Sequence, residues 1–309
     1  MNLTPINQTK LFGLEKFFDQ FVHLYDKKSF PKKILLSGKK GIGKATLAYH
    51  LINYIHSYEE KDSYNKENYE INYENKSFKL MNNNSSPNFY LIDLAIDKKN
   101  IDINQVRGLI NYANKSSFND KEKIVLIDNI EFLNVNSINA LLKILEEPNK
   151  NLHFILINSS NKILPTLKSR CIDFKINLTF SETIGVVNKI LQIDIQHHLN
   201  KTFLNHYYSP GDLIEIYLQL KNHNFDPMNT SLKSFLNKII DEKLYKKDNS
   251  IKKKIFEYIQ LYFQRELSSS NQKLAEYYNS FIKKISDTRK FNLDDESLFL
   301  EFRTRVLNE

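Results

Sequence analysis

The sequence predicts an α/β domain with a parallel sheet, followed by a second half built only of helices. Short apolar runs alternate with helical spacing between residues 11 and 158. Two of these runs, KIVLID at 123–128 and HFILIN at 153–158, are apolar nearly throughout, as in parallel strands covered on both faces. From about Asn177 strand-like runs stop and amphipathic spacing continues to the C-terminus.

The first predicted elements surround a glycine-rich turn. A helix is expected over Leu11–Tyr25, where apolar residues recur every three or four positions. A buried strand at 34–36 follows, and helical spacing resumes from residue 46 to residue 55. The sequence therefore predicts a strand that leads through a tight turn into a helix.

The turn itself matches a phosphate-binding motif. Gly38, Gly41, Gly43 and Lys44 fit the pattern G-x-x-x-x-G-K, in which backbone N–H groups surround phosphates and the lysine reaches the outer ones. The motif normally continues with Ser or Thr, whose hydroxyl holds Mg²⁺, but Ala45 stands there. Two interpretations stay open: a nucleotide site without this metal ligand, or a loop kept only as a turn.

Beyond the turn the predicted elements continue to alternate. Residues 57–87 are rich in Asn, Glu, Lys and Tyr and predict a long surface insertion that is partly disordered. Asn104 is the candidate N-cap of the next helix, and Pro148 should end the one after it. The elements expected after the insertion are strand 89–94, helix 101–112, strand 123–128, helix 137–145 and strand 153–158.

Length and composition bound the class of protein. A chain of 309 residues predicts two or three domains, and 41% hydrophobic residues suffice to build them. No run is long enough to span a membrane and the N-terminus lacks a signal-peptide core, so we expect a cytoplasmic protein. The single Cys171 excludes a disulfide framework and a four-cysteine zinc site. The net charge of +8 is spread along the chain and decides little.

An ATPase of this type also needs acidic residues at the end of another strand, here called the acidic station, which hold Mg²⁺ and activate water. Asp128 ends its strand and fits the residue that holds Mg²⁺ through water, or it simply caps the turn. The position for a water-activating glutamate holds Asn129, which cannot act as a base. Glu131 is near in sequence, but we expect it to point elsewhere. Hydrolysis by this chain is therefore not expected.

Two further segments follow the predicted sheet strands. Asn158 ends a strand with two serines after it, where such folds sense phosphate, although a polar turn explains it equally. Arg170 lies in LPTLKSRC, residues 164–171, where a fixed guanidinium would reach a neighbouring subunit's nucleotide. A plain surface arginine is the alternative.

Motifs along the chain resemble a known family. The segments NALLKILEEP at 139–148 and LPTLKSRC at 164–171 resemble the clamp-loader branch of the AAA+ ATPases. With GIGKATLAY at 41–49 and IDINQVR at 101–107, the chain is most similar to the delta-prime subunits of the bacterial DNA polymerase III clamp loader.

The resemblance implies an architecture and a role. It implies a RecA-like AAA+ domain over 1–176, a three-helix lid over 177–223 and a helical collar over 224–309 that joins five subunits. It also implies a stator that does not hydrolyse ATP. Arg170, with Ser169 and Cys171 as its motif, would act in trans on ATP held by a gamma/tau-like subunit. The implied partners are this ATPase, a delta-like subunit, the sliding clamp indirectly and primer-template DNA, without a membrane.

The sequence departs from the family at two places. Relatives carry a four-cysteine zinc module after the P-loop helix, but residues 57–87 contain no cysteine, so we expect no zinc and no other metal. The Ser209-Pro210-Gly211 segment resembles the lid helix that bears a phosphate-sensing arginine, but Asp212 follows it and would repel phosphate. We expect no firmly bound cofactor, with ATP and Mg²⁺ the one candidate.

The alternatives are enzymes. The first is an ATP-hydrolysing, gamma/tau-like motor subunit of the same loader, favoured by Lys44 and Asp128 and opposed by Ala45, Asn129 and Asp212. The second is a small-molecule P-loop kinase, which the NALLKILEEP segment opposes.

Overall fold

The computed structural model describes residues 3–95, 98–115, 121–146, 151–160, 165–267, 272–291 and 294–308. The chain divides into two compact units. The first comprises Met1–Ile190 with Ser209–Asp212, and the second comprises Leu191–Tyr208 with Leu213–Glu309. The expected division into three domains at residues 176 and 223 stays a prediction.

A parallel sheet forms the centre of the first unit. Its strands are β1 (Lys33–Ser37), β2 (Phe89–Ile92), β3 (Lys123–Ile127), β4 (Leu152–Asn158) and β5 (Ile172–Lys175). They lie in the order β2-β3-β4-β1-β5, and all pairs are parallel, which confirms the predicted α/β sheet. The sequence did not indicate β5, because this edge strand is only partly buried and carries no apolar run.

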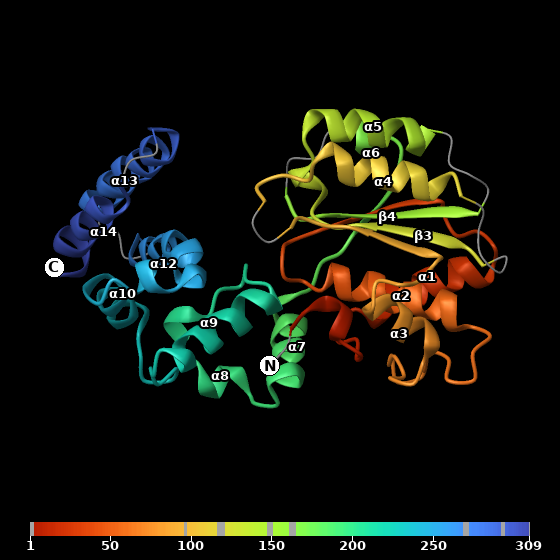
Figure 1. Ribbon diagram of the computed structural model, residues 1–309. Helices are drawn as coiled ribbons and strands as arrows, with labels where there is room; N and C mark the ends of the chain where they lie inside the picture. The colour runs from red at the N-terminus through yellow and green to blue at the C-terminus, as the bar shows by residue number, and fades with distance from the viewer. Residues whose placement is uncertain are drawn as a thin grey trace. The chain divides into compact units, whose positions relative to one another are not determined.

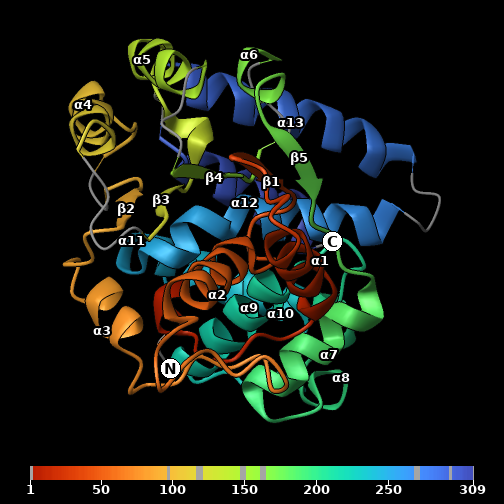
Figure 2. The same cartoon turned by 90° about the vertical axis from the view of Figure 1, so that its right-hand side faces the viewer.

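Helices cover both faces of the sheet (Figures 1 and 2). One face is covered by α1 (Glu15–Asp26), α2 (Lys44–Ser57) and α3 (Lys76–Asn82), and the other by α4 (Ile103–Ala113), α5 (Val135–Glu146) and α6 (Pro165–Lys168). Successive side chains of β3 alternate between the faces: Ile124 and Leu126 join the core beneath α2, and Val125 and Ile127 join the core beneath α4 and α5. Apolar side chains on both faces explain the continuous run in the sequence.

The N-cap of α4 differs from the prediction. Asp102, not Asn104, caps this helix: its Oδ1 accepts hydrogen bonds from the backbone N–H groups of Asn104 and Gln105. The Gln105 side chain accepts in return from the Asp102 N–H, which completes a capping box. Pro148, which was predicted to end α5, lies outside the described residues.

The segment 57–87 is not a loose insertion, and that prediction is wrong. Four of its side chains are buried in the core that α1 and α2 share: Tyr64, Ile71, Phe78 and Met81. The Tyr64 ring stacks on Phe18 with centroids 4.9 Å apart. Asn75 is fully buried, caps α3 through the Phe78 N–H and pairs with the Asn53 amide. Widely spaced aromatic rings supply the apolar area that the polar composition conceals.

The described residues after β5 contain only helices and turns. The helices are α7 (Phe180–Leu191), α8 (Ile195–His198), α9 (Pro210–Asn222), α10 (Leu232–Asp241), α11 (Leu244–Lys247), α12 (Asn249–Glu266), α13 (Gln272–Phe291) and α14 (Glu296–Phe302). Short 3₁₀ segments occur at Pro5–Asn7, Ile130–Phe132 and Lys201–Phe203, and a π segment at Arg303–Leu307. Among the helices seen here, none is long and apolar enough to cross a membrane.

Candidate functional site

The predicted phosphate loop follows the carboxyl end of β1. Gly43 has a φ of 99°, in the left-handed region that suits glycine, and it directly precedes Lys44, the first residue of α2. Gly41 also has a positive φ of 78°, and Gly38 donates its N–H to the Asn158 carbonyl at 3.3 Å. The strand, turn and helix predicted from the sequence are therefore present.

Lys44 is turned onto its own loop. Its Nζ donates to the carbonyl oxygens of Gly38 at 2.8 Å and Lys39 at 2.7 Å, and the residue is only 4% exposed. Burial lowers the pKa of Lys44 to about 8, while the carboxylates of Asp128 and Glu131 partly oppose this change. The ammonium satisfies loop carbonyls in this conformation, so a phosphate would have to displace these contacts.

The first turn of α9 closes over the same loop. The Gly211 N–H donates to the Gly41 carbonyl at 3.0 Å. The Asp212 carboxylate lies 3.0 Å from the Lys39 Nζ, and it also accepts hydrogen bonds from Ser209. Asp212 thus brings a negative charge to the loop, where a phosphate-sensing arginine would bring a positive one.

The acidic station at the end of β3 is partly buried. Burial raises the pKa of Asp128 to about 6, and the nearby Asp93 adds to this rise. Asp128 accepts a hydrogen bond from the Asn129 N–H at 2.7 Å. The Asn129 amide donates to Asp93 at 2.7 Å, so the side chain in the glutamate position is held by a neighbouring carboxylate. These contacts fit the turn-capping interpretation of Asp128.

Glu131 does not point away from the site, and that expectation is wrong. Both of its carboxylate oxygens accept from the Ser159 N–H at 3.3 Å. It also lies near enough to Lys44 and Asp128 to raise the pKa of each. Asn129 has a left-handed φ of 56°, which turns the chain into the short segment that carries Glu131. An asparagine directly before the glutamate segment was the signal that sequence reasoning missed.

Asn158 lies at the end of β4, beside the phosphate loop. Its Nδ2 donates to the Ser160 carbonyl at 2.6 Å, and its Oδ1 accepts from the Ser160 N–H at 3.3 Å. The residue is 3% exposed. The side chain therefore closes its own turn in this conformation, although its position next to β1 is the one expected of a phosphate sensor.

Arg170 lies at the opposite edge of the sheet. Ile172 in β5 pairs with Ile34 in β1, so Arg170 lies level with the start of β1. At about 3.3 Å per residue, Gly38 is roughly 20 Å further along the strand direction. The predicted loop, acidic station and Asn158 thus meet at the carboxyl edge, and Arg170 lies beyond their reach at the amino edge.

The two residues beside Arg170 are fixed by different contacts. The Ser169 hydroxyl donates to the Thr166 carbonyl at 3.1 Å, which closes the short helix α6. Cys171 packs against the core beneath α4 and α5, and burial raises the pKa of its thiol to about 11. The thiol is therefore protonated at neutral pH and serves as packing. Together they hold the backbone on both sides of Arg170.

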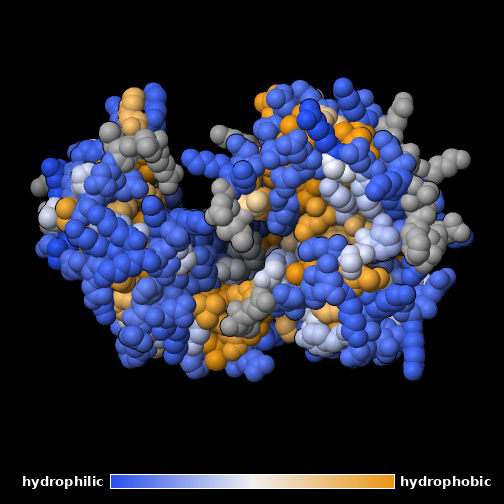
Figure 3. Space-filling model, viewed as in Figure 1, coloured by the Kyte–Doolittle hydropathy of each residue, from blue (hydrophilic) through white to orange (hydrophobic). Residues whose placement is uncertain are grey.

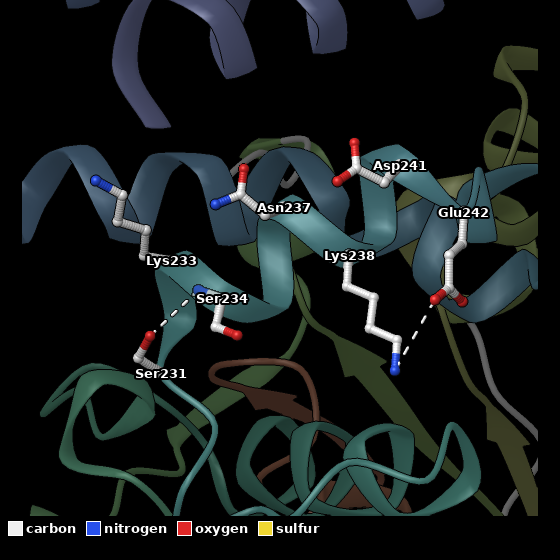
Figure 4. A pocket seen from close by; sticks show the side chains of 7 residues that line it. All are labelled: Ser231, Lys233, Ser234, Asn237, Lys238, Asp241 and Glu242. Atoms are coloured by element: carbon white, nitrogen blue, oxygen red, sulfur yellow. Dashed lines mark hydrogen bonds and ion pairs between the residues drawn. The ribbon is translucent and has the colours of Figure 1, made fainter. Parts of the chain in front are cut away.

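Elsewhere, the described surface shows no comparable convergence of charged and polar side chains. The face in Figure 3 is mainly hydrophilic, with hydrophobic areas over the layer of α4, α5 and α6. A hollow of about 490 Å³ lies along α10 in the second unit (Figure 4). Its polar side chains diverge: Asn237 and Asp241 point to one side, and Lys238 and Glu242 to the other. Within the ranges described, no group of three or more His, Cys, Asp or Glu side chains is placed to hold a metal ion.

Comparisons with known proteins find a matching family model and similar subunits of DNA polymerase III. The model of the family described as "DNA polymerase III, delta subunit" matches residues 13–179. A DNA polymerase III subunit delta' from Buchnera aphidicola subsp. Baizongia pistaciae is 33% identical over 178 residues, covering 56% of this chain and 49% of that protein. A DNA polymerase III subunit gamma from Buchnera aphidicola subsp. Schizaphis graminum is 41% identical over 98 residues, covering 31% and 26%. The chain thus matches about half, or less, of the length of these relatives.

The comparison with solved structures also finds a polymerase-related protein. It is a DNA polymerase III gamma-subunit-related protein from Thermotoga maritima, 18% identical, with a TM-score of 0.48 over 94% of this chain and 98% of that one.

Proposed function

The chain belongs to the DNA polymerase III delta subunit family, and from this premise we propose that it is a stator subunit of a replicative clamp loader. The similarity to delta-prime subunits that its motifs indicated is confirmed. In this role the chain joins a gamma/tau-like ATPase and a delta-like subunit in the cytoplasm through a lid and a C-terminal collar. It helps place the sliding clamp on primer-template DNA, and Arg170 acts on the ATP of the neighbouring ATPase.

The position of Arg170 is the observation that carries this proposal. An arginine about 20 Å from its own phosphate loop cannot stabilise charge there, yet its side chain is 32% exposed and its backbone is fixed on both sides. An arginine supplied to a neighbouring subunit's phosphoryl-transfer site increases the rate of hydrolysis there by about 10³- to 10⁵-fold. The closed contacts of Lys44 and Asp212 support the absence of hydrolysis at the chain's own loop.

The test is reconstitution of the complex with its ATPase subunit, clamp and primed DNA. We expect Arg170→Ala to lower clamp-stimulated hydrolysis by about 10³-fold or more. Arg107→Ala is the matched control, because Arg107 is an exposed arginine on α4 whose Nη1 donates to the Asn104 side chain at 3.5 Å. Unchanged hydrolysis with Arg170→Ala in an assembled complex would sink the trans role.

A second candidate is a gamma/tau-like motor subunit that hydrolyses ATP itself. The identity to a gamma subunit over 98 residues and the presence of Gly43 and Lys44 favour it. Equilibrium binding of labelled ATP to the isolated chain separates the two functions. Tight binding that depends on Mg²⁺, with turnover, would favour the motor, and its absence would favour the stator.

A further inference from the structure

The Arg170 guanidinium is already paired within its own chain. Its Nε and Nη2 both donate to Oε1 of Glu146, at 3.2 and 2.6 Å, and its Nη1 donates to the Thr166 carbonyl at 3.0 Å. These contacts occupy three of the five N–H groups of an arginine. Any anion that approaches Arg170 from outside therefore meets a guanidinium whose charge is balanced by Glu146.

We propose that Glu146 is an internal competitor, which holds and neutralises Arg170 until phosphate oxygens of a neighbouring subunit's nucleotide replace its carboxylate. This inference rests on the trans role proposed above for Arg170. It adds a positioning residue that acts through the arginine and sets how readily the arginine is released.

The geometry of the pair makes this exchange feasible. Only one oxygen of Glu146 contacts the guanidinium, and the Glu146 side chain is 53% exposed. Exposed ion pairs contribute little net free energy, whereas a phosphate offers more charge and several acceptor oxygens for the planar guanidinium. The Thr166 carbonyl can keep its contact during the exchange, so the arginine stays oriented.

The position of Glu146 in α5 does not stabilise that helix. It is the last residue of α5, and a carboxylate at a helix C-terminus is disfavoured by the helix dipole. The end of α5 is nevertheless firmly held, because Leu145 is fully buried and its carbonyl accepts from the Lys33 Nζ at 3.0 Å. The backbone thus fixes the carboxylate beside Arg170, while its side chain remains open to solvent.

The experiment uses the assembled complex and measures ATP hydrolysis over a range of ATP concentrations. Glu146→Gln removes the charge and keeps the size, so we expect the KM for ATP to fall, or hydrolysis at low ATP to rise, about two- to fivefold. Glu74→Gln is the matched control, since Glu74 is an exposed carboxylate paired with Lys79 of α3, and α3 belongs to the helices on the other face of the sheet. In the double variant Glu146→Gln with Arg170→Ala, the gain should vanish.

The outcomes separate the two proposals. No change, or a loss, with Glu146→Gln while Arg170→Ala still abolishes stimulation would overturn the competitor role alone. A gain that persists without Arg170 would also overturn it, because the carboxylate would then act by another route. Full activity of a complex that carries Arg170→Ala would contradict the proposed trans role of Arg170, on which the role of Glu146 rests.

Discussion

The carboxyl and amino edges of the sheet hold ionisable groups in different ways. At the carboxyl edge, Lys44 is buried and Asp128 is partly buried, and burial moves the pKa of each toward neutrality. At the amino edge, Arg170 and Glu146 stay partly in water and pair with each other. A buried charge affects folding strongly, whereas an exposed pair affects folding little and remains available to a partner.

This difference leads to an expectation about substitutions. Changes at the carboxyl edge should alter the free energy of unfolding and its pH dependence. Changes at the amino edge should leave stability nearly unaltered and act on the complex. The predictions below test this separation, from the largest expected change in stability to the smallest.

Asp128→Asn should change the acid side of the stability profile. The pKa of Asp128 is about 6 in the folded chain against an ordinary value of 3.8, so the folded state binds more protons between these pH values. The native protein therefore gains stability relative to the variant as the pH falls from 7 to 4, by about 2.5 kcal/mol. Urea unfolding of both proteins at each pH measures this difference.

Comparing the two proteins removes the contribution of other acid-sensitive groups. His50 and His56 are buried, and burial lowers the pKa of each to about 4, so both proteins lose stability to their protonation alike. A difference between native protein and variant that stays constant with pH would show that Asp128 is not the buried charge described here.

Lys44→Met should change how the stability of the protein depends on pH in the alkaline range. The pKa of Lys44 is about 8 in the folded chain against an ordinary value of 10.5, so the unfolded state binds more protons between these pH values. Stability of the native protein should therefore rise relative to the variant by about 2 kcal/mol from pH 8 to pH 10. If both proteins show parallel profiles in denaturant titrations over this range, the burial of the ammonium is disproved.

Gly211→Ala tests the contact between the first turn of α9 and the loop. An added Cβ would lie 2.9 Å from the Gly41 Cα and 3.0 Å from its carbonyl oxygen, so we expect a loss of about 2 kcal/mol. Gly185→Ala is the control: it lies within α7 with no atom near an added Cβ, and it should gain about 0.5 to 1 kcal/mol. If thermal unfolding shows that Gly211→Ala is as stable as the native protein, or gains stability as Gly185→Ala does, the close approach is contradicted.

Arg170→Ala and Glu146→Gln should change stability least. An exposed ion pair contributes less than about 1 kcal/mol, so the midpoints of urea unfolding should shift only slightly. The same variants carry the functional effects proposed above. A large loss of stability in either variant would show that the amino edge is part of the folding core, and the contrast between the edges would fail.

Much of this arrangement followed from local patterns. The run KIVLID predicted a strand covered on both faces, and helices do pack on both sides of β3. The strand, turn and helix around Gly43 and Lys44 were also correctly placed. Such features depend on neighbours in sequence, and hydrophobic periodicity records them directly.

Other features depended on contacts between distant residues. The pairing of β5 with β1 places Arg170 far from the phosphate loop, and no local sequence pattern predicts that pairing. The polar segment 57–87 folds because Tyr64 and Phe78 find a core supplied by α1 and α2. The sequence alone thus determined the apolar central strands, the turn into α2 and which charged residues are present. Only the tertiary structure decided which charges are buried and which stay accessible, because burial and pairing arise from residues far apart along the chain.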